Sequence, residues 1–244
     1  MSDAHADAIL DGRPRVLLVG ATGLIGRTII ARSPALSDIV LQGLARREIP
    51  FAPGTRIELV LAESDQWPNV VAQLQPDAVI SALGTTRRKA GSDEAFREVD
   101  HDLVLELARA AKETGVRNFV QVSSVGADQY SKNNYLRVKG ETEKDLKALK
   151  FHRLDLLRPG LLRGKRQNDI RPLEKTGQVF APVADIFLRG DKAKYRSIRA
   201  ADLADAALDA ATAKAGGQFV HEHDALMRLA REFQRRLAEK EDAA

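Results

Sequence analysis

The sequence predicts an α/β fold in which a doubly wound parallel sheet carries helices on both faces. Three observations lead to this expectation. Short apolar runs alternate with helix-length segments from residue 15 to about residue 160, a glycine-rich turn joins the first run to the first helix, and the 244 residues are 44% hydrophobic. Alternation of this kind favours right-handed crossovers between parallel strands.

The expected strands are short apolar runs, as in strands that are buried on both faces of a sheet. Glycine follows the first run at Gly20 and the fourth at Gly84, where each strand would turn into a loop. In chain order the expected strands cover residues 15–20, 39–45, 57–60, 78–83, 118–123, 151–157 and 218–220.

The expected helices begin and end at residues that commonly bound helices. Pro34 follows the first helix and Gly115 follows the third, and Asn133 and Asn134 are expected to cap the fourth. In chain order the expected helices cover residues 24–32, 66–74, 95–114, 135–149, 200–213 and 224–239.

The chain is expected to form one domain over residues 15–244 after a flexible leader of residues 1–14. The regular alternation fades after Gly160, so residues 160–244 are expected to form a smaller, irregular and helical part on the substrate side. The last helix carries an apolar stripe among many charges. That stripe either packs on its own domain or forms a homodimer or protein contact; its residues are Leu226, Leu229, Ala230, Phe233 and Leu237.

Composition excludes several classes of protein. The chain has no cysteine, which rules out disulfides and thiolate metal sites. It shows no signal peptide and no apolar run near the ~18 residues of a membrane span, so a cytoplasmic protein without membrane contact is expected. The net charge of +4 is spread in small groups, so nucleic-acid binding is not expected.

One short segment resembles a metal site. His221, His223 and Asp224 lie close together at a junction between an expected strand and an expected helix. Asp224 is a natural cap for that helix, and no further ligand stands at a recognised spacing. We therefore expect no metal site.

The turn Gly20-Ala-Thr-Gly23-Leu-Ile-Gly26 lies between the first strand and the first helix. Glycines in such a turn allow a tight bend, close approach to a pyrophosphate, and packing of the helix on the strand. The helix N-terminus offers unpaired N–H groups and a positive dipole end to phosphates. The turn therefore predicts a Rossmann-type dinucleotide site.

The end of the second strand indicates which dinucleotide is bound. A site that prefers NAD usually has an acidic residue there, which accepts hydrogen bonds from the ribose 2′-hydroxyl. This chain has Arg46 and Arg47 instead. Guanidinium groups are charged, forked donors that suit a 2′-phosphate, so NADPH is expected in preference to NADH.

A serine pair, a tyrosine and a lysine follow in an order that suggests catalysis. Ser123 and Ser124 end a strand, and Tyr135 and Lys139 stand four residues apart on the next helix, on one face. A lysine ammonium stabilises the phenolate form of a nearby tyrosine. Tyr135 could then exchange a proton with a carbonyl oxygen, and one of the serines could hold that oxygen.

These residues together resemble the short-chain dehydrogenases/reductases, and the atypical branch that includes the Tat-interactive protein oxidoreductases. The likeness runs from about residue 15 to about residue 171, and its telling strings are residues 82–91, 122–128, 135–141 and 158–162. The resemblance implies catalytic roles for Ser124 (with Ser123 as the alternative), Tyr135 and Lys139. It implies NADPH contacts at Gly20, Thr22, Gly23, Leu24, Ile25, Gly26, Arg46, Arg47, Leu83, Gly84, Tyr135, Lys139, Leu162 and Arg171.

The sequence therefore predicts an NADPH-dependent oxidoreductase that reduces a small carbonyl compound. Two alternatives stay open. One is an NADPH-binding regulatory or scaffold protein, because fold and cofactor do not establish a reaction. The other is chemistry like that of the sugar-nucleotide epimerases, which use the same kind of constellation.

Overall fold

The computed structural model describes residues 12–164 and 190–242. Its centre is a seven-stranded sheet in the order β3-β2-β1-β4-β5-β6-β9, with every neighbouring pair parallel. This confirms the expected α/β class. The strands are β1 (Arg15–Val19), β2 (Val40–Ala45), β3 (Glu58–Leu61), β4 (Ala78–Ser81), β5 (Asn118–Val122), β6 (Arg153–Leu157) and β9 (Gly217–His221).

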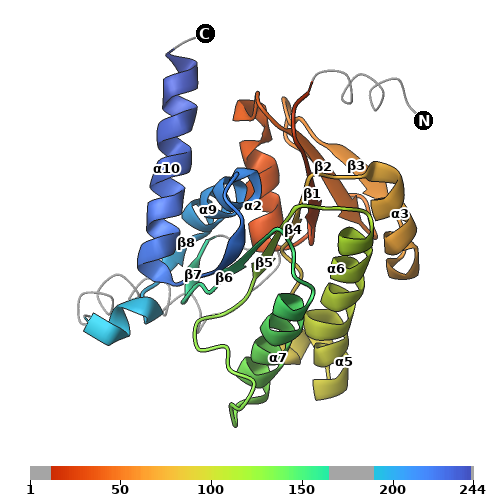
Figure 1. The fold of residues 1–244 in the computed structure, drawn as a ribbon, viewed down its shortest axis with the longest axis vertical. Helices are drawn as coiled ribbons and strands as arrows, with labels where there is room; N and C mark the ends of the chain where they lie inside the picture. Colours follow the sequence, from red (N-terminus) through yellow and green to blue (C-terminus); the bar gives the residue numbers. More distant parts are fainter. Residues whose placement is uncertain (1–11, 165–189, 243–244) are drawn as a thin grey trace.

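Helices cover both faces of the sheet, with α2, α9 and α10 on one side and α3, α6 and α7 on the other (Figure 1). The helices are α2 (Leu24–Arg32), α3 (Trp67–Leu74), α4 (Arg87–Ala90), α5 (Asp93–Arg97), α6 (Leu103–Glu113), α7 (Asn134–Ala148), α9 (Ala200–Thr212) and α10 (His223–Glu241), with short 3₁₀ turns at Ser33–Ala35, Ser64–Gln66 and Gly190–Tyr195. Strand order reverses direction between β1 and β4, and such a switch point is where doubly wound sheets bind ligands.

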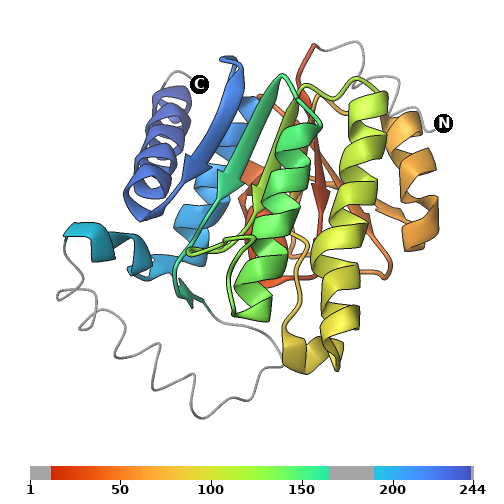
Figure 2. The same ribbon diagram turned by 60° about the horizontal axis from the view of Figure 1, so that its bottom comes forward.

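The strands feed two apolar cores, one on each face of the sheet. In β1, Val16 and Leu18 face the core under α2 and α9, whereas Leu17 and Val19 face the core under α3 and α6. All four side chains are fully buried, which explains why the strand is a continuous apolar run. Figure 2 shows α6 and α7 side by side across the second face.

The expected long helix over residues 95–114 is interrupted. It starts earlier, at Asp93, and a π-helical turn at Glu98–Asp102 separates α5 from α6. Ser92 caps its start by accepting a hydrogen bond from the Ala95 N–H. A π-turn re-aims the side chains that it carries and is frequent at functional sites.

The two expected caps have different outcomes. The side chain of Asn133 accepts a hydrogen bond from the Leu136 N–H and caps α7, which confirms that expectation. The expectation for Asp224 is wrong, because α10 begins one residue earlier with Glu222 at the cap position. Asp224 lies in the first turn and contacts the ring of His223 at 3.0 Å.

The C-terminal helices attach to the same sheet. On α10, Leu226, Ala230 and Phe233 are buried in the core that also holds α2 and α9. Pairing of this helix with a second copy or with another protein stays a prediction. The flexible leader of residues 1–14 and the smaller part that starts at residue 160 also stay predictions, and residues 1–11 of the leader lie outside the described part. Within the described ranges, no helix is long and apolar enough to cross a membrane.

Two buried aspartates join α9 to its neighbours. Asp205, which is fully buried, pairs with Arg32 of α2 at 2.8 Å and accepts a hydrogen bond from Gln234 of α10. Asp209 pairs with Arg236 of α10 at 2.5 Å. Burial raises the pKa of both carboxyl groups, although these partners oppose the change.

We predict that Asp205→Asn changes the pH dependence of stability. The raised pKa of Asp205 means that the folded state binds its proton more tightly than the unfolded chain does. Its contribution is therefore fully present below the unfolded pKa, about 4, and is lost as pH rises through the folded pKa. Urea unfolding should show that the wild-type advantage over Asp205→Asn shrinks as pH rises.

Asp224→Asn is the matched control with the opposite sign. The hydrogen bond from His223 lowers the pKa of Asp224, so its contribution is present above its unfolded pKa and is lost on acidification. A wild-type advantage over Asp205→Asn that grows with pH would contradict the assignment.

Candidate active site

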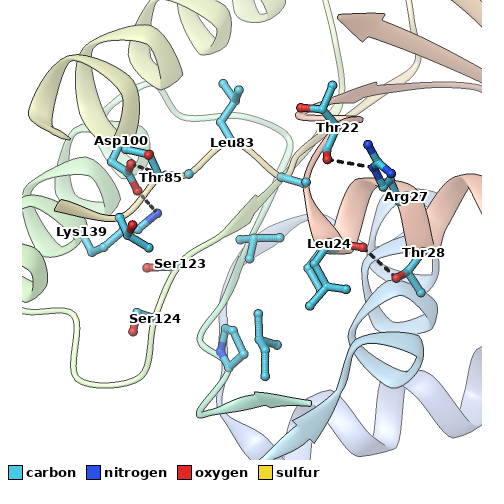
Figure 3. A pocket seen from close by; sticks show the side chains of 18 of the residues that line it. Thr22, Leu24, Arg27, Thr28, Leu83, Thr85, Asp100, Ser123, Ser124 and Lys139 are labelled. Carbon is cyan, nitrogen blue, oxygen red and sulfur yellow. Dashed lines mark hydrogen bonds and ion pairs between the residues drawn. The ribbon is translucent and has the colours of Figure 1, made fainter. Parts of the chain in front are cut away.

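A cleft of about 680 Å³ opens at the carboxyl ends of β1, β4 and β5, at the switch point of the sheet. In Figure 3, Thr22, Leu24 and Arg27 lie on one side of it, at the start of α2. Ser124 and Lys139 lie on the other side, on the β5–α7 part of the chain. The cleft therefore brings the glycine turn and the predicted catalytic residues to one place.

The glycine turn fits its strands so closely that two positions exclude a side chain. A Cβ on Gly20 would lie 2.5 Å from the carbonyl carbon of Ala82, and φ there is +89°. A Cβ on Gly26 would lie 2.3 Å from the Gly20 carbonyl oxygen. Gly23 is different, because a Cβ there would come no closer than 3.4 Å to any described atom outside its chain neighbours. Gly23 lines the cleft, so the open space is on the ligand side.

The N-terminus of α2 has the features of a position that can bind an anion. Gly23 is its cap residue, no side chain of the described residues caps the helix, and its first turn contains no acidic residue. Thr22, Leu24 and Ile25 line the cleft around it. Backbone N–H groups without intrahelical partners and the helix dipole favour phosphate at such a position. The site therefore fits the pyrophosphate of a dinucleotide.

Arg27 is a cleft residue that the sequence analysis missed. It lies on α2, lines the cleft, and its Nε donates to the carbonyl oxygen of Thr22 at 3.1 Å. Its signal in the sequence is a cation directly after Gly26, the last glycine of the turn.

Arg46 and Arg47 directly follow β2 and are exposed. Leu44 is in register with Val19 of β1, so the arginines lie beside the glycine turn. They do not line the cleft itself, and no residue in the described part of the chain forms a hydrogen bond or ion pair with either guanidinium group. Their place at the rim leaves both groups available to a ribose substituent that extends out of the cleft.

Lys139 is held by a carboxylate inside the cleft. Its Nζ lies 2.8 Å from Oδ1 of Asp100, and the two side chains are almost completely buried. Burial is the largest effect on the pKa of Lys139 and lowers it, but the attraction of Asp100, then Tyr135, and the hydrogen bond to Asp100 together raise the pKa above its ordinary value. Lys139 is therefore a stable ammonium group at neutral pH.

Asp100 is the second residue that the sequence analysis missed. Three successive residues of a regular helix do not share a face, so the sequence does not distinguish Asp100 from its neighbours His101 and Asp102. The π-turn instead aims Asp100 at Lys139 and at the Thr85 N–H, which donates to Oδ2 at 2.8 Å. The available signal was a carboxylate on the buried side of the helix, in line with Phe96 and Leu107.

Tyr135 and Lys139 line the same cleft, one helical turn apart on α7. The ring of Tyr135 packs against Phe96, with 5.5 Å between the ring centroids. Tyr135 as a whole is 37% exposed. The phenol of Tyr135 is therefore partly accessible to a ligand in the cleft, and the buried ammonium of Lys139 interacts electrostatically with that phenol.

The two serines have different surroundings. Ser123 is buried and its hydroxyl donates to Glu143 at 2.5 Å, and Glu143 in turn accepts a 2.9 Å hydrogen bond from Arg158. Ser124 is half-buried, and its hydroxyl makes a 3.3 Å hydrogen bond to the Val125 carbonyl oxygen. Both serines line the cleft, but only the proton of Ser123 is committed to a carboxylate.

Of the other expected cofactor contacts, Leu83, Gly84 and Leu162 line the cleft. A Cβ on Gly84 would lie 3.4 Å from Oδ1 of Asp100, so the loop after β4 rests against the ion pair. Arg171 lies outside the described residues. Lys89 of α4 also lines the cleft.

The two histidine side chains of the segment that resembles a metal site have different surroundings. His221 turns inward and its Nε2 lies 2.7 Å from Oδ1 of the buried Asp155. His223 contacts Asp224 instead. The two imidazoles therefore serve different partners.

Comparison with known proteins places this cleft in a family. Residues 16–153 match the model of the NAD dependent epimerase/dehydratase family. The chain is similar to "Protein fmp52, mitochondrial" of Emericella nidulans, with 39% identity over 68% of this chain and 74% of the relative. It is also similar to "Protein FMP52, mitochondrial" of Eremothecium gossypii, with 42% identity over 67% of this chain and 73% of the relative.

Solved structures share the fold. The Bordetella bronchiseptica enzyme WbmH in complex with NAD⁺ has a TM-score of 0.63 at 16% identity, over 86% of this chain and 76% of that one. UDP-glucose 4-epimerase from Thermotoga maritima has a TM-score of 0.64 at 15% identity, over 89% and 82%. Identities this low establish the fold alone.

These relatives correct one expectation. The expected cytoplasmic location is wrong by this comparison, because the fungal relatives are named as mitochondrial proteins. The absence of a recognisable signal did not exclude another compartment.

The family model covers more than half of the chain, and the glycine turn and the cleft fit its dinucleotide. The chain belongs to the NAD dependent epimerase/dehydratase family, with the NAD(P)-binding Rossmann fold that this family shares.

Proposed function

We propose that the chain is an NADPH-dependent oxidoreductase that reduces the carbonyl group of a small molecule, close to the Tat-interactive branch of the atypical reductases. One observation carries the proposal: Ser124, Tyr135 and Lys139 line the same cleft as the anion-binding start of α2. The proposed proton donor, the hydroxyl that would bind the substrate oxygen and the cofactor-binding turn therefore lie around the same cleft.

The glycine turn and the start of α2 would hold the pyrophosphate, and Arg46 and Arg47 would hold a ribose 2′-phosphate. NADPH, when bound, supplies the hydride. The preference for NADPH follows from charge, because two exposed guanidinium groups stand where an NAD site carries a carboxylate. Lys139 would also reach the nicotinamide ribose.

Tyr135 would donate its phenolic proton to the carbonyl oxygen. The ammonium of Lys139 would stabilise the phenolate that is left, because a positive charge nearby favours the charged form of the phenol. Asp100 would keep that ammonium in place through its 2.8 Å ion pair. In this role Asp100 is a positioning residue that acts through Lys139.

Ser124 is the better candidate to hold the substrate oxygen. Ser123 already donates its proton to Glu143, so it cannot donate to a substrate without breaking a buried charge-assisted hydrogen bond. Ser124 would exchange only a longer bond to a carbonyl oxygen.

Epimerase chemistry is the second candidate, because the family model and the fold neighbours include epimerases. The arginine pair argues against it, since the epimerase/dehydratase family is described as NAD dependent. A regulatory, cofactor-binding protein is the third candidate. The buried Lys139–Asp100 pair beside Tyr135 favours an enzyme over it.

We predict that Arg46→Asp weakens NADPH binding by about 10- to 100-fold, the loss expected for a charged hydrogen bond, and changes NADH binding much less. Fluorescence titration of both nucleotides measures this. Arg109→Asp, an equal charge change at an exposed position on α6, is the control. Equal losses for NADPH and NADH would sink the assignment of Arg46.

We predict that Gly23→Ala preserves the fold but weakens NADPH binding by about tenfold or more. The backbone at Gly23 has φ −75°, which alanine adopts, and its methyl group would occupy only cleft space. Gly26→Ala is the contrasting variant: its Cβ would clash with backbone, so its Tm should fall by more than about 4 °C. Unchanged NADPH affinity in Gly23→Ala would show that the nucleotide does not bind at the glycine turn.

We predict that Tyr135→Phe lowers the rate of NADPH oxidation with aldehyde or ketone substrates by about 100- to 10,000-fold, because it removes the proton donor. NADPH affinity should stay unchanged, since the ring and its packing on Phe96 remain. Tyr130→Phe, at an 83% exposed position outside the cleft, is the control. Full turnover in Tyr135→Phe would refute its role.

A further inference from the structure

A second concave surface lies beside the candidate active site. Two short strands, β7 (Leu162–Arg163) and β8 (Ile198–Arg199), form a parallel ribbon outside the main sheet. Leu162 lines the active-site cleft, whereas the next residue, Arg163, lines a separate pocket of about 410 Å³. The backbone of β7 therefore separates the two cavities. We call the second one the arginine pocket, defined by Arg163, Arg196 and Arg199.

The arginine pocket carries excess positive charge. Register places Arg163 opposite Arg199, and like charges opposite one another on neighbouring strands repel. Asp202 is the one carboxylate residue that lines the pocket within residues 12–164 and 190–242. Arg199 already binds it through two contacts, of 2.7 and 2.6 Å. Three arginines and one carboxylate residue therefore line the pocket, and Arg199 already binds that carboxylate.

Two further features favour an anion there. The Nε of Arg163 is buried and has no hydrogen-bond partner among the described atoms, which is costly for a charged donor. His223, the first residue of α10, also lines the pocket, and α9 starts directly after Arg199. The N-termini of α9 and α10 therefore lie at the pocket, and Asp202 and Asp224 in their first turns offset part of the positive dipole field.

We propose that the arginine pocket binds a phosphate group of a ligand other than the dinucleotide held at the glycine turn. Guanidinium groups offer paired donors in a plane that matches phosphate oxygens, and Arg163 supplies an unused donor. An anion between Arg163 and Arg199 would also relieve their repulsion. The inference rests on these residues and does not depend on the proposed reaction.

Calorimetric titration with inorganic pyrophosphate tests the proposal in the Gly23→Ala variant, in which the added methyl group is expected to weaken the competing site at the glycine turn. Adding Arg163→Gln should weaken pyrophosphate binding by about tenfold or more. Adding Arg228→Gln, which removes an exposed charge from α10 outside the pocket, should leave it unchanged. Equal effects of the two substitutions, or no binding in Gly23→Ala, would overturn the proposal.

A site-specific readout covers the case in which a substitution disturbs the fold. The ring proton signals of His223, assigned with His223→Gln, should shift on addition of pyrophosphate to the wild-type protein, and this shift should be lost in Arg163→Gln and in Arg196→Gln. The same shift should persist in the presence of saturating NADPH. If NADPH abolishes it, the anion is the cofactor's own phosphate and the separate site is refuted. Arg46→Asp should not affect it, so failure of the proposed reaction stays distinguishable.

Discussion

The close contact between the glycine turn and β4 is the constraint on which the site depends. Gly20 lies against the backbone of Ala82, and Gly26 lies against Gly20, with no room for a side chain at either position. This packing starts α2 shortly after the end of β1 and leaves its N-terminus facing the cleft at the carboxyl ends of β1 and β4. The position of the α2 N-terminus at the switch point of the sheet follows from that fit.

The opposite wall of the cleft depends on a buried ion pair. Asp100 of the π-turn holds Lys139 of α7 and also accepts from the loop after β4 through Thr85. One carboxylate thus joins three segments that meet at the cleft. Removing a partner from such a pair leaves an uncompensated buried charge, which is strongly destabilising. The arrangement fixes the position of the ammonium beside Tyr135 and keeps it charged.

A second buried carboxylate divides the serines. Glu143, one turn after Lys139 on α7, binds both Ser123 and Arg158. The hydrogen bond from the guanidinium of Arg158 to Glu143 raises the pKa of Arg158, and this effect is larger than the lowering that burial causes. The Arg158–Glu143 pair therefore stays charged at neutral pH. This network holds the end of β5 against α7 and leaves Ser124 as the hydroxyl that is free to reorient.

The sequence by itself determined the elements that depend on local pattern. Apolar runs identified the strands, the glycine spacing identified the nucleotide turn, and the four-residue spacing of Tyr135 and Lys139 placed them on one face. Only the tertiary structure decided what depends on segments distant in the chain: the pairing of Asp100 with Lys139, the commitment of Ser123 to Glu143, and the arginine pocket beside β7. Hydrogen bonds and ion pairs of this kind have no periodic signature, because their partners are set by how helices pack on the sheet. The π-turn shows the same limit, since periodicity predicted one continuous helix where packing re-aims Asp100.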